Sequence, residues 1–227
     1  MPGGQRVYAV GDIHGLDERL GTLHALIAAD LRTRPVAAAT VVHLGDYIDR
    51  GPDSAKVLAR LSGLRRIGRA GVVNLMGNHE RTLLDALAGD APAATDFLHQ
   101  GGGATLASLG IDAAVPAAEW SARMARASLG FLRGLALMHR AGGYLFVHAG
   151  IRPGIAPDRQ LAADLVSIRQ PFLASEADFG VVVVHGHTPV PAPAIRANRI
   201  GIDTGAALGG PLTAAVLEGD TVGFLAA

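Results

Sequence analysis

Five apolar runs occur along the chain, and each stops at a glycine or histidine beside polar side chains. Short apolar runs of this kind are typical of buried β-strands. The five segments are VYAVGDIHG (7–15), VVHLGDYIDRG (41–51), VVNLMGNHE (72–80), YLFVHAG (144–150) and VVVVHGHT (181–188). This repeated arrangement predicts that potential metal ligands collect where several strands end.

Helical spacing of apolar residues connects the first three runs. Leucine and isoleucine recur at this spacing through about residues 16–31, and a second helix is expected to open at Pro52. Strands are predicted at about 40–44 and 72–76. This βαβαβ order indicates a mostly parallel sheet, in which ligands collect beyond the carboxyl ends of the strands.

The rest of the chain divides into a helical segment and a second set of strands. Residues 83–140 have helical patterning with few candidate ligands, so we expect a helical cap. Strands are predicted at 143–148, 181–185, 198–203, 212–218 and 221–225, the last two with hairpin spacing. We therefore expect a single α/β domain over residues 1–227, built as a four-layer sandwich of two mixed β-sheets flanked by helices.

Composition narrows the functional classes. Twenty basic and twenty acidic residues leave no net charge, so no attraction to nucleic acid or an anionic membrane is expected. The absence of cysteine excludes disulfides, zinc–thiolate sites and a cysteine nucleophile. No apolar run reaches the length of a membrane span and no leader pattern precedes the first strand, which predicts a cytoplasmic protein.

The first two motifs supply carboxylates and a histidine. Asp12 and His14 are two residues apart at a strand end and can face one ion, although a helix-capping aspartate would give the same pattern. Asp46 has two oxygens and can bridge two cations held about 3.5–4 Å apart. Asp49 and Arg50 are then available for other work, with a local surface salt bridge as the alternative interpretation.

The third motif adds a neutral ligand. Asn78 offers an amide oxygen that binds a metal without adding charge, and His79 beside it would face the substrate as a proton donor. For Glu80 we expect a structural role, either capping the following helix or holding a backbone group.

Histidines end the last two runs. A single strand-end histidine is more often a hydrogen-bonded core residue, but three such residues in this context favour ligands, and we assign His148 and His187 to metal and His185 to their support. Arg169 stands alone in an apolar stretch. A buried arginine needs an anionic partner, which would be a bound phosphate or a structural carboxylate.

In order and content, GDIHG, GDYIDRG, GNHE, HAG and GHT resemble the motifs of the calcineurin-like metallophosphoesterases, specifically the phosphoprotein phosphatase branch. ANRIGIDTGA (197–206), DLVSIRQPFL (164–173) and FVHAGIRPG (146–154) look like those of the short bacterial serine/threonine protein phosphatases. The resemblance spans about residues 7–225.

This resemblance implies roles for the site residues. Asp12, His14 and Asp46 would hold one metal, and Asp46, Asn78, His148 and His187 the other. Arg50 and Arg169 would bind phosphate beside Asn78 and His79, and His79, oriented by Asp49, would protonate the leaving group. Two divalent ions are expected, manganese or else iron, zinc or cobalt.

Several positions distinguish the subfamilies of these metallophosphoesterases. Pro189 stands where many phosphodiesterases of the superfamily have a further metal-binding histidine, and Asp49 where symmetrical dinucleoside tetraphosphatases typically have alanine. Met76, Ser167 and Gly201 depart from residues common in close relatives, and the first two could alter the cleft wall.

We therefore expect a phosphoprotein (serine/threonine) phosphatase in which a hydroxide activated by two metals attacks phosphorus in line. Its substrates would be phosphorylated proteins or peptides, or small phosphoesters. The alternative is a dinucleoside polyphosphate or nucleotide hydrolase that uses the same site. A catalytically silent phosphate-binding module is the third possibility.

Overall fold

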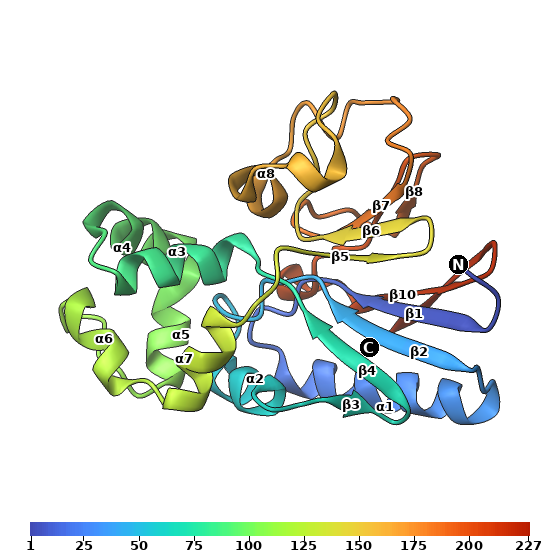
Figure 1. The fold of residues 1–227 in the computed structure, drawn as a ribbon. Coiled ribbons are helices and arrows are strands. Elements are labelled where there is room, and N and C mark those ends of the chain that lie inside the picture. The colour runs from blue at the N-terminus through green and yellow to red at the C-terminus, as the bar shows by residue number, and fades with distance from the viewer.

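The computed structural model describes all of residues 1–227 as two packed β-sheets with helices on their outer faces and a helical lobe at one end (Figure 1). The strands are β1 (Gln5–Val10), β2 (Ala38–His43), β3 (Arg66–Ile67), β4 (Ala70–Asn74), β5 (Met138–Ala141), β6 (Tyr144–Val147), β7 (Val182–His185), β8 (Ala194–Ile195), β9 (Arg199–Gly201), β10 (Thr213–Glu218) and β11 (Thr221–Ala226).

The helices are α1 (Asp17–Thr33), α2 (Ser54–Leu61), α3 (Asn78–Leu87), α4 (Ala91–Phe97), α5 (Gly103–Ser108), α6 (Ala117–Arg123), α7 (Arg126–Arg133) and α8 (Ala162–Ser167). A π-helical turn (Leu98–Gly102) joins α4 to α5, and short 3₁₀ turns cover Pro157–Arg159 and Ala206–Leu208. None of the helices has the length and apolar character needed to cross a lipid bilayer.

Both sheets mix parallel and antiparallel strands. The first has the order β11-β10-β1-β2-β4-β3, and the second has the order β5-β6-β7-β9-β8. β1, β2 and β4 run parallel, as do β6, β7 and β9. The carboxyl ends of these six strands therefore deliver the loops that follow them to a shared edge of the molecule.

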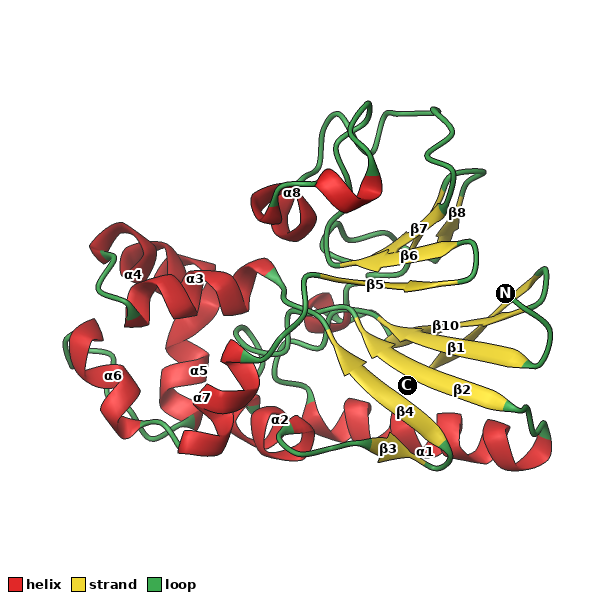
Figure 2. Ribbon diagram, viewed as in Figure 1, coloured by secondary structure: helices red, strands yellow, loops and turns green.

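The alternation along β1 shows why the layers stack. Val7 and Ala9 lie in the apolar cluster between the two sheets, together with Phe146 of β6, whereas Tyr8 and Val10 face the larger cluster formed with α1 and the helical lobe. Successive strand residues point to opposite faces, so both faces of β1 are buried. α8 packs outside the second sheet, and Figure 2 shows the four layers this produces.

The expected four-layer sandwich of two mixed sheets is confirmed, with local differences. The helical segment begins at Asn78 rather than near residue 83 and ends at Arg133, and most of β5 falls within the range expected to be helical. The helical lobe, α3–α7, buries Trp120 and Phe97 at its centre. The β10–β11 hairpin turns at Gly219 and Asp220, as its spacing predicts.

Candidate metal centre

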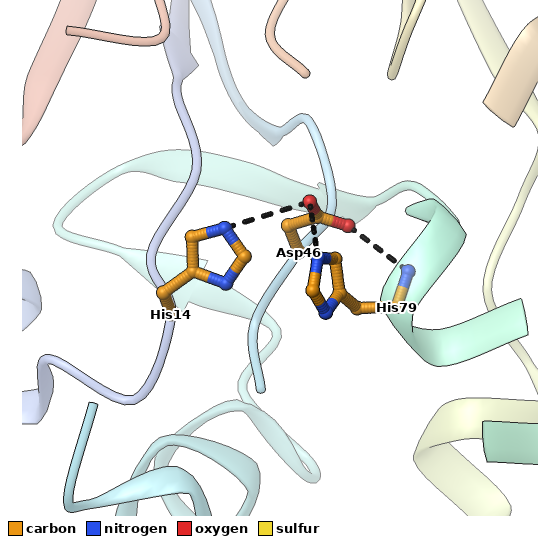
Figure 3. A group of neighbouring side chains, drawn as sticks. All are labelled: His14, Asp46 and His79. Carbon is orange, nitrogen blue, oxygen red and sulfur yellow. Dashed lines mark hydrogen bonds and ion pairs between the residues drawn. The ribbon is translucent and has the colours of Figure 1, made fainter. Parts of the chain in front are cut away.

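The predicted ligands converge at the carboxyl ends of the central strands. Asp46, after β2, lies between two groups: one brings it together with His14 and His79, and the other with His148 and His187. His14 Nε2 lies 3.6 Å from Asp46 Oδ2, and His148 Nε2 lies 3.3 Å from Asp46 Oδ1. In Figure 3, dashed lines join the rings of His14 and His79 to the same carboxylate oxygen of Asp46.

Backbone geometry at the site is unusual. The structure has five non-glycine residues with positive φ, and all five were candidate site residues: His14, Asp46, Asp49, Arg50 and His187. Such conformations cost energy and persist where the surrounding structure imposes them, commonly at functional sites. The sharp turns they produce aim successive side chains into one small volume.

Two glycines allow the loops after β2 and β4 to touch. A Cβ on Gly45 would lie 2.6 Å from the backbone nitrogen of Gly77, and one on Gly77 would overlap the Asp46 carboxylate. This close approach brings Asp46 and Asn78 together.

Hydrogen bonds fix the imidazole orientations. His14 Nδ1 lies 2.8 Å from the carbonyl oxygen of Ile48, and His148 Nδ1 lies 3.0 Å from that of Leu44. A carbonyl accepts only, so each Nδ1 carries the proton, and each Nε2 presents a lone pair to the cluster. This is the arrangement of metal-ligating histidines, whose other nitrogen donates to a carbonyl or carboxylate.

Asn78 joins the second group. Its Oδ1 lies 3.1 Å from His148 Nε2 and 2.8 Å from His187 Nδ1, while its Nδ2 donates to Gln100 Oε1 at 3.3 Å. The amide is thereby oriented with its oxygen toward the two histidines. Asp12 is buried at the backbone of His187, whose N–H donates to its carboxylate at 3.1–3.2 Å.

The site combines buried carboxylates with neutral histidines. Burial, and then the neighbouring Asp203, raises the pKa of Asp12, while burial and Asp12 raise that of Asp46. Burial lowers the pKa of His14 to about 3 and that of His187 to about 4. Crowded carboxylates and unprotonated imidazoles are the groups that a pair of divalent cations would bind, so the residues present fit two such ions.

A buried pair of side chains, His79 and Asp49, adjoins the candidate metal ligands. His79 Nδ1 lies 2.6 Å from Asp49 Oδ2, and both side chains are enclosed. His79 Nε2 then points toward the Arg50 guanidinium, at 3.2 Å, and toward Asp46. The Arg50 side chain contacts His14 as well, and Arg50 itself is exposed.

One expectation about the site was wrong. Arg169 was expected to be buried, but it is exposed, and it forms no salt bridge. Its neighbour Ile168 turns inward, which directs Arg169 outward. Burial and then the positive charge of Arg169 lower the pKa of His187, so the guanidinium lies near this candidate ligand.

Glu80 holds backbone groups, as expected, and His185 lies beside the turn that carries His187. Glu80 is fully buried, and its carboxylate accepts four backbone N–H groups from the loops that carry Asp46 and Asn78. His185 is buried next to the ligand turn, with Nδ1 3.0 Å from the Gly186 carbonyl oxygen and its ring edge-on to Phe172.

Sequence reasoning missed Asp203, Thr105 and Gln100. Asp203 ends the apolar run Ile200-Gly201-Ile202 and is followed closely by Gly205, the same signal that marked the other ligands, so it was detectable. Its pKa is raised by burial. Thr105 and Gln100 belong to the helical lobe, where nothing in the local pattern distinguishes them from ordinary helix residues.

Met76 and Ser167, which differ from the residues common in close relatives, line one hollow. It has a volume of about 360 Å³, lies between α3 and α8, and extends to Asn78. Its other walls include Leu137, Val166 and the paired Arg81 and Asp85. An open, partly apolar surface therefore adjoins the candidate ligand Asn78.

Comparisons with known proteins show which sequences this chain resembles. The symmetrical bis(5'-nucleosyl)-tetraphosphatase of Paracidovorax citrulli is 34% identical over 160 residues, which are 68% of this chain and 48% of that protein. This chain spans about half the length, or less, of the curated relatives it matches.

Solved structures share the fold. A candidate diadenosine tetraphosphatase superposes with a TM-score of 0.69 at 24% identity, covering 97% of this chain and 93% of the other. A cold-active protein tyrosine phosphatase superposes with a TM-score of 0.66 at 18% identity, and the match covers 100% of this chain and 80% of the phosphatase chain. The family model for calcineurin-like phosphoesterases matches residues 5–216. The chain therefore belongs to the calcineurin-like phosphoesterase family.

Proposed function

We propose that this protein hydrolyses phosphoesters with two divalent cations, and that its substrates are dinucleoside polyphosphates. The observation that carries the reaction class is the placement of Asp46 between two sets of ligand atoms whose lone pairs face it. The substrate class rests on the relatives, several of which are named symmetrical bis(5'-nucleosyl)-tetraphosphatases. They favour the alternative from the sequence over its first choice, the phosphoprotein phosphatase.

We assign one cation to Asp12, His14 and Asp46, and the other to Asp46, Asn78, His148 and His187. Once bound, such a pair of ions lowers the pKa of water toward neutrality and neutralises charge on phosphate oxygens. Oxygen and nitrogen ligands without sulfur suit manganese, iron, zinc or cobalt.

The remaining polar residues would bind substrate and move a proton. Arg50 and Arg169 are exposed guanidiniums near the ligand cluster, able to bind non-bridging phosphate oxygens bidentately and to stabilise the charge of the transition state. His79, held at Nδ1 by Asp49, offers Nε2 to the departing oxygen.

A second candidate is hydrolysis of phosphoserine or phosphothreonine, and the Asp49–His79 pair favours it. An alkoxide is a poor leaving group that needs a proton, whereas a departing nucleotide phosphate is stable as an anion. A buried, tightly hydrogen-bonded acid is therefore of most use for an alkyl phosphoester.

The deciding experiment compares substrates under identical manganese concentrations. Diadenosine tetraphosphate, a phosphoserine peptide, a phosphotyrosine peptide and 4-nitrophenyl phosphate are assayed by phosphate release and nucleotide chromatography. We expect the highest kcat/KM for the dinucleotide, with ADP as the product of symmetrical cleavage. Faster turnover of the phosphoserine peptide would support the second candidate, and no turnover of any substrate would leave a phosphate-binding module.

A variant tests the assigned role of Asp46. Asp46→Asn removes the charge shared by both ligand groups, so we expect metal content and activity to fall together. Both metals bound at full occupancy in this variant would contradict the bridging assignment.

A further inference from the structure

The π-helical turn and α5 contact the site at three points. Gln100 accepts a hydrogen bond from the Asn78 amide, the Gly101 carbonyl oxygen accepts one from the Arg50 backbone nitrogen at 3.3 Å, and Thr105 binds Asp49. Gly101 has φ 103°, and a Cβ there would lie 3.1 Å from the Arg50 side chain and backbone nitrogen. The π-helical turn thus passes directly against the loop that carries Arg50.

Thr105 makes the tightest of these contacts. Its Oγ1 donates to Asp49 Oδ1 at 2.6 Å and accepts from the Asp49 backbone nitrogen at 2.8 Å. Thr105 and Asp49 are both fully enclosed. One hydroxyl therefore links the backbone and the carboxylate of the same residue.

The two carboxylate oxygens of Asp49 have separate partners. Oδ2 faces His79 Nδ1 at 2.6 Å, and the sole hydrogen-bond partner of Oδ1 is Thr105. The last torsion of an aspartate is soft, so a carboxylate held at one oxygen can turn. Holding Oδ1 fixes the direction in which Oδ2 meets the imidazole.

We propose that Thr105 is a positioning residue: through Asp49, it holds His79 in the orientation that delivers a proton to the leaving group. α5, which carries none of the candidate metal ligands, thereby contributes to the acid machinery of the site. This inference rests on the proposed function, because it takes His79 as the proton donor.

The test uses variants that separate the effect of the Thr105 hydroxyl from the effect of the side chain's shape. Thr105→Val keeps the branched shape and removes the hydroxyl, whereas Thr105→Ser keeps the hydroxyl. Ser54→Ala is the matched control, since Ser54 Oγ lies 3.0 Å from Thr105 Oγ1 and accepts from the Asp49 nitrogen without contacting its carboxylate. Metal content is measured for every variant and is expected to be unchanged.

Phenyl phosphate and 4-nitrophenyl phosphate differ in how much the leaving oxygen needs a proton. For Thr105→Val we expect kcat on phenyl phosphate to fall about tenfold, with less than about a threefold loss on 4-nitrophenyl phosphate, within the range of general-acid effects. Thr105→Ser should recover most of the loss, and Ser54→Ala should leave the ratio of the two rates unchanged. Equal losses on both substrates, or no recovery with serine, would overturn the proposal.

A double-mutant cycle shows whether Thr105 acts through Asp49. In an Asp49→Asn background, Thr105→Val should cause no further loss on phenyl phosphate. Full additivity would mean that Thr105 acts by another route. Should Thr105→Val fail to fold, Thr105→Ala, which adds no bulk, is compared with Thr105→Ser in its place.

Proton NMR provides a readout independent of turnover. The His79 Nδ1 proton lies in a short hydrogen bond to Asp49 and should give a far-downfield resonance in the wild type and in Thr105→Ser. In Thr105→Val this resonance should shift or broaden. An unchanged resonance in Thr105→Val would contradict the positioning role. If the wild type hydrolysed no phosphoester, the proposed function would fail while this resonance still tested the hydrogen-bonded arrangement.

Discussion

Glu80 holds together the two loops that carry Asp46 and Asn78. Its buried carboxylate accepts the backbone N–H groups of Asp46, Tyr47, Ile48 and Gly77 at 2.9, 2.7, 3.2 and 3.1 Å. Glu80→Gln preserves the shape of this side chain and replaces one acceptor oxygen with an amide NH₂. The variant therefore tests whether the carboxylate holds the loops together.

The magnitude follows from how the four bonds are shared. Oε2 accepts from Asp46 and Gly77, and Oε1 accepts from Tyr47 and Ile48. Whichever way the glutamine amide turns, two backbone donors face its NH₂ group. An unsatisfied buried donor costs about 1–3 kcal/mol, so the free energy of unfolding should fall by about 2–6 kcal/mol. Domains are typically stable by about 5–15 kcal/mol, so the loss is large.

Urea unfolding followed by circular dichroism measures this loss. Glu119→Gln is the matched control, because Glu119 is exposed on α6 and paired only with Arg123, and a change of less than about 1 kcal/mol is expected there. A Glu80→Gln protein within about 0.5 kcal/mol of wild type would refute the reasoning, since four hydrogen bonds to one carboxylate would then contribute almost nothing.

Three further variants test other parts of the account. His79→Asn should slow alkyl phosphoesters about 10²–10⁴-fold and 4-nitrophenyl phosphate far less, and an equal loss on both would exclude His79 as the acid. His24 is buried with its Nε2 2.9 Å from His43 Nε2, and burial lowers its pKa to about 4. Below about pH 6.5 the unfolded state therefore binds more protons than the native state, so the free energy of unfolding decreases as the pH decreases. Between pH 7 and pH 5, His24 should account for about 2 kcal/mol of this decrease. In urea unfolding, the free energy of unfolding of His24→Gln should therefore decrease by about 2 kcal/mol less than that of the wild type over this pH range; the same decrease in both proteins would contradict this. Ser167→Trp should fill the hollow beside Asn78 and lower kcat/KM for diadenosine tetraphosphate more than for 4-nitrophenyl phosphate. Equal changes in kcat/KM for the two substrates would mean that the hollow does not bind substrate.

The sequence predicted the central strands, and the convergence of the polar side chains that follow them, for one physical reason. A buried parallel strand is a short apolar run, and its carboxyl end lies beside those of its neighbours, so ligand residues after β1, β2, β4, β6 and β7 had to converge. Asp12, Asp46, Asn78, His148 and His187 all follow such runs, and the structure brings them together.

The parts that were missed depend on tertiary packing. Thr105 lies 56 residues from Asp49 along the chain, within a helix whose sequence shows no sign of that contact. Arg169 was misread because its apolar surroundings suggested burial, whereas the local alternation turns Ile168 inward and Arg169 outward. Patterns predict which elements form, but a contact between distant elements requires their relative placement.

The most direct test of the proposed two-cation centre is anomalous diffraction from crystals grown with manganese. The account predicts two peaks about 3.5–4 Å apart, on opposite sides of the Asp46 carboxylate, with Asp12 and His14 at one and Asn78, His148 and His187 at the other. A single peak, or manganese bound away from Asp46, would contradict it.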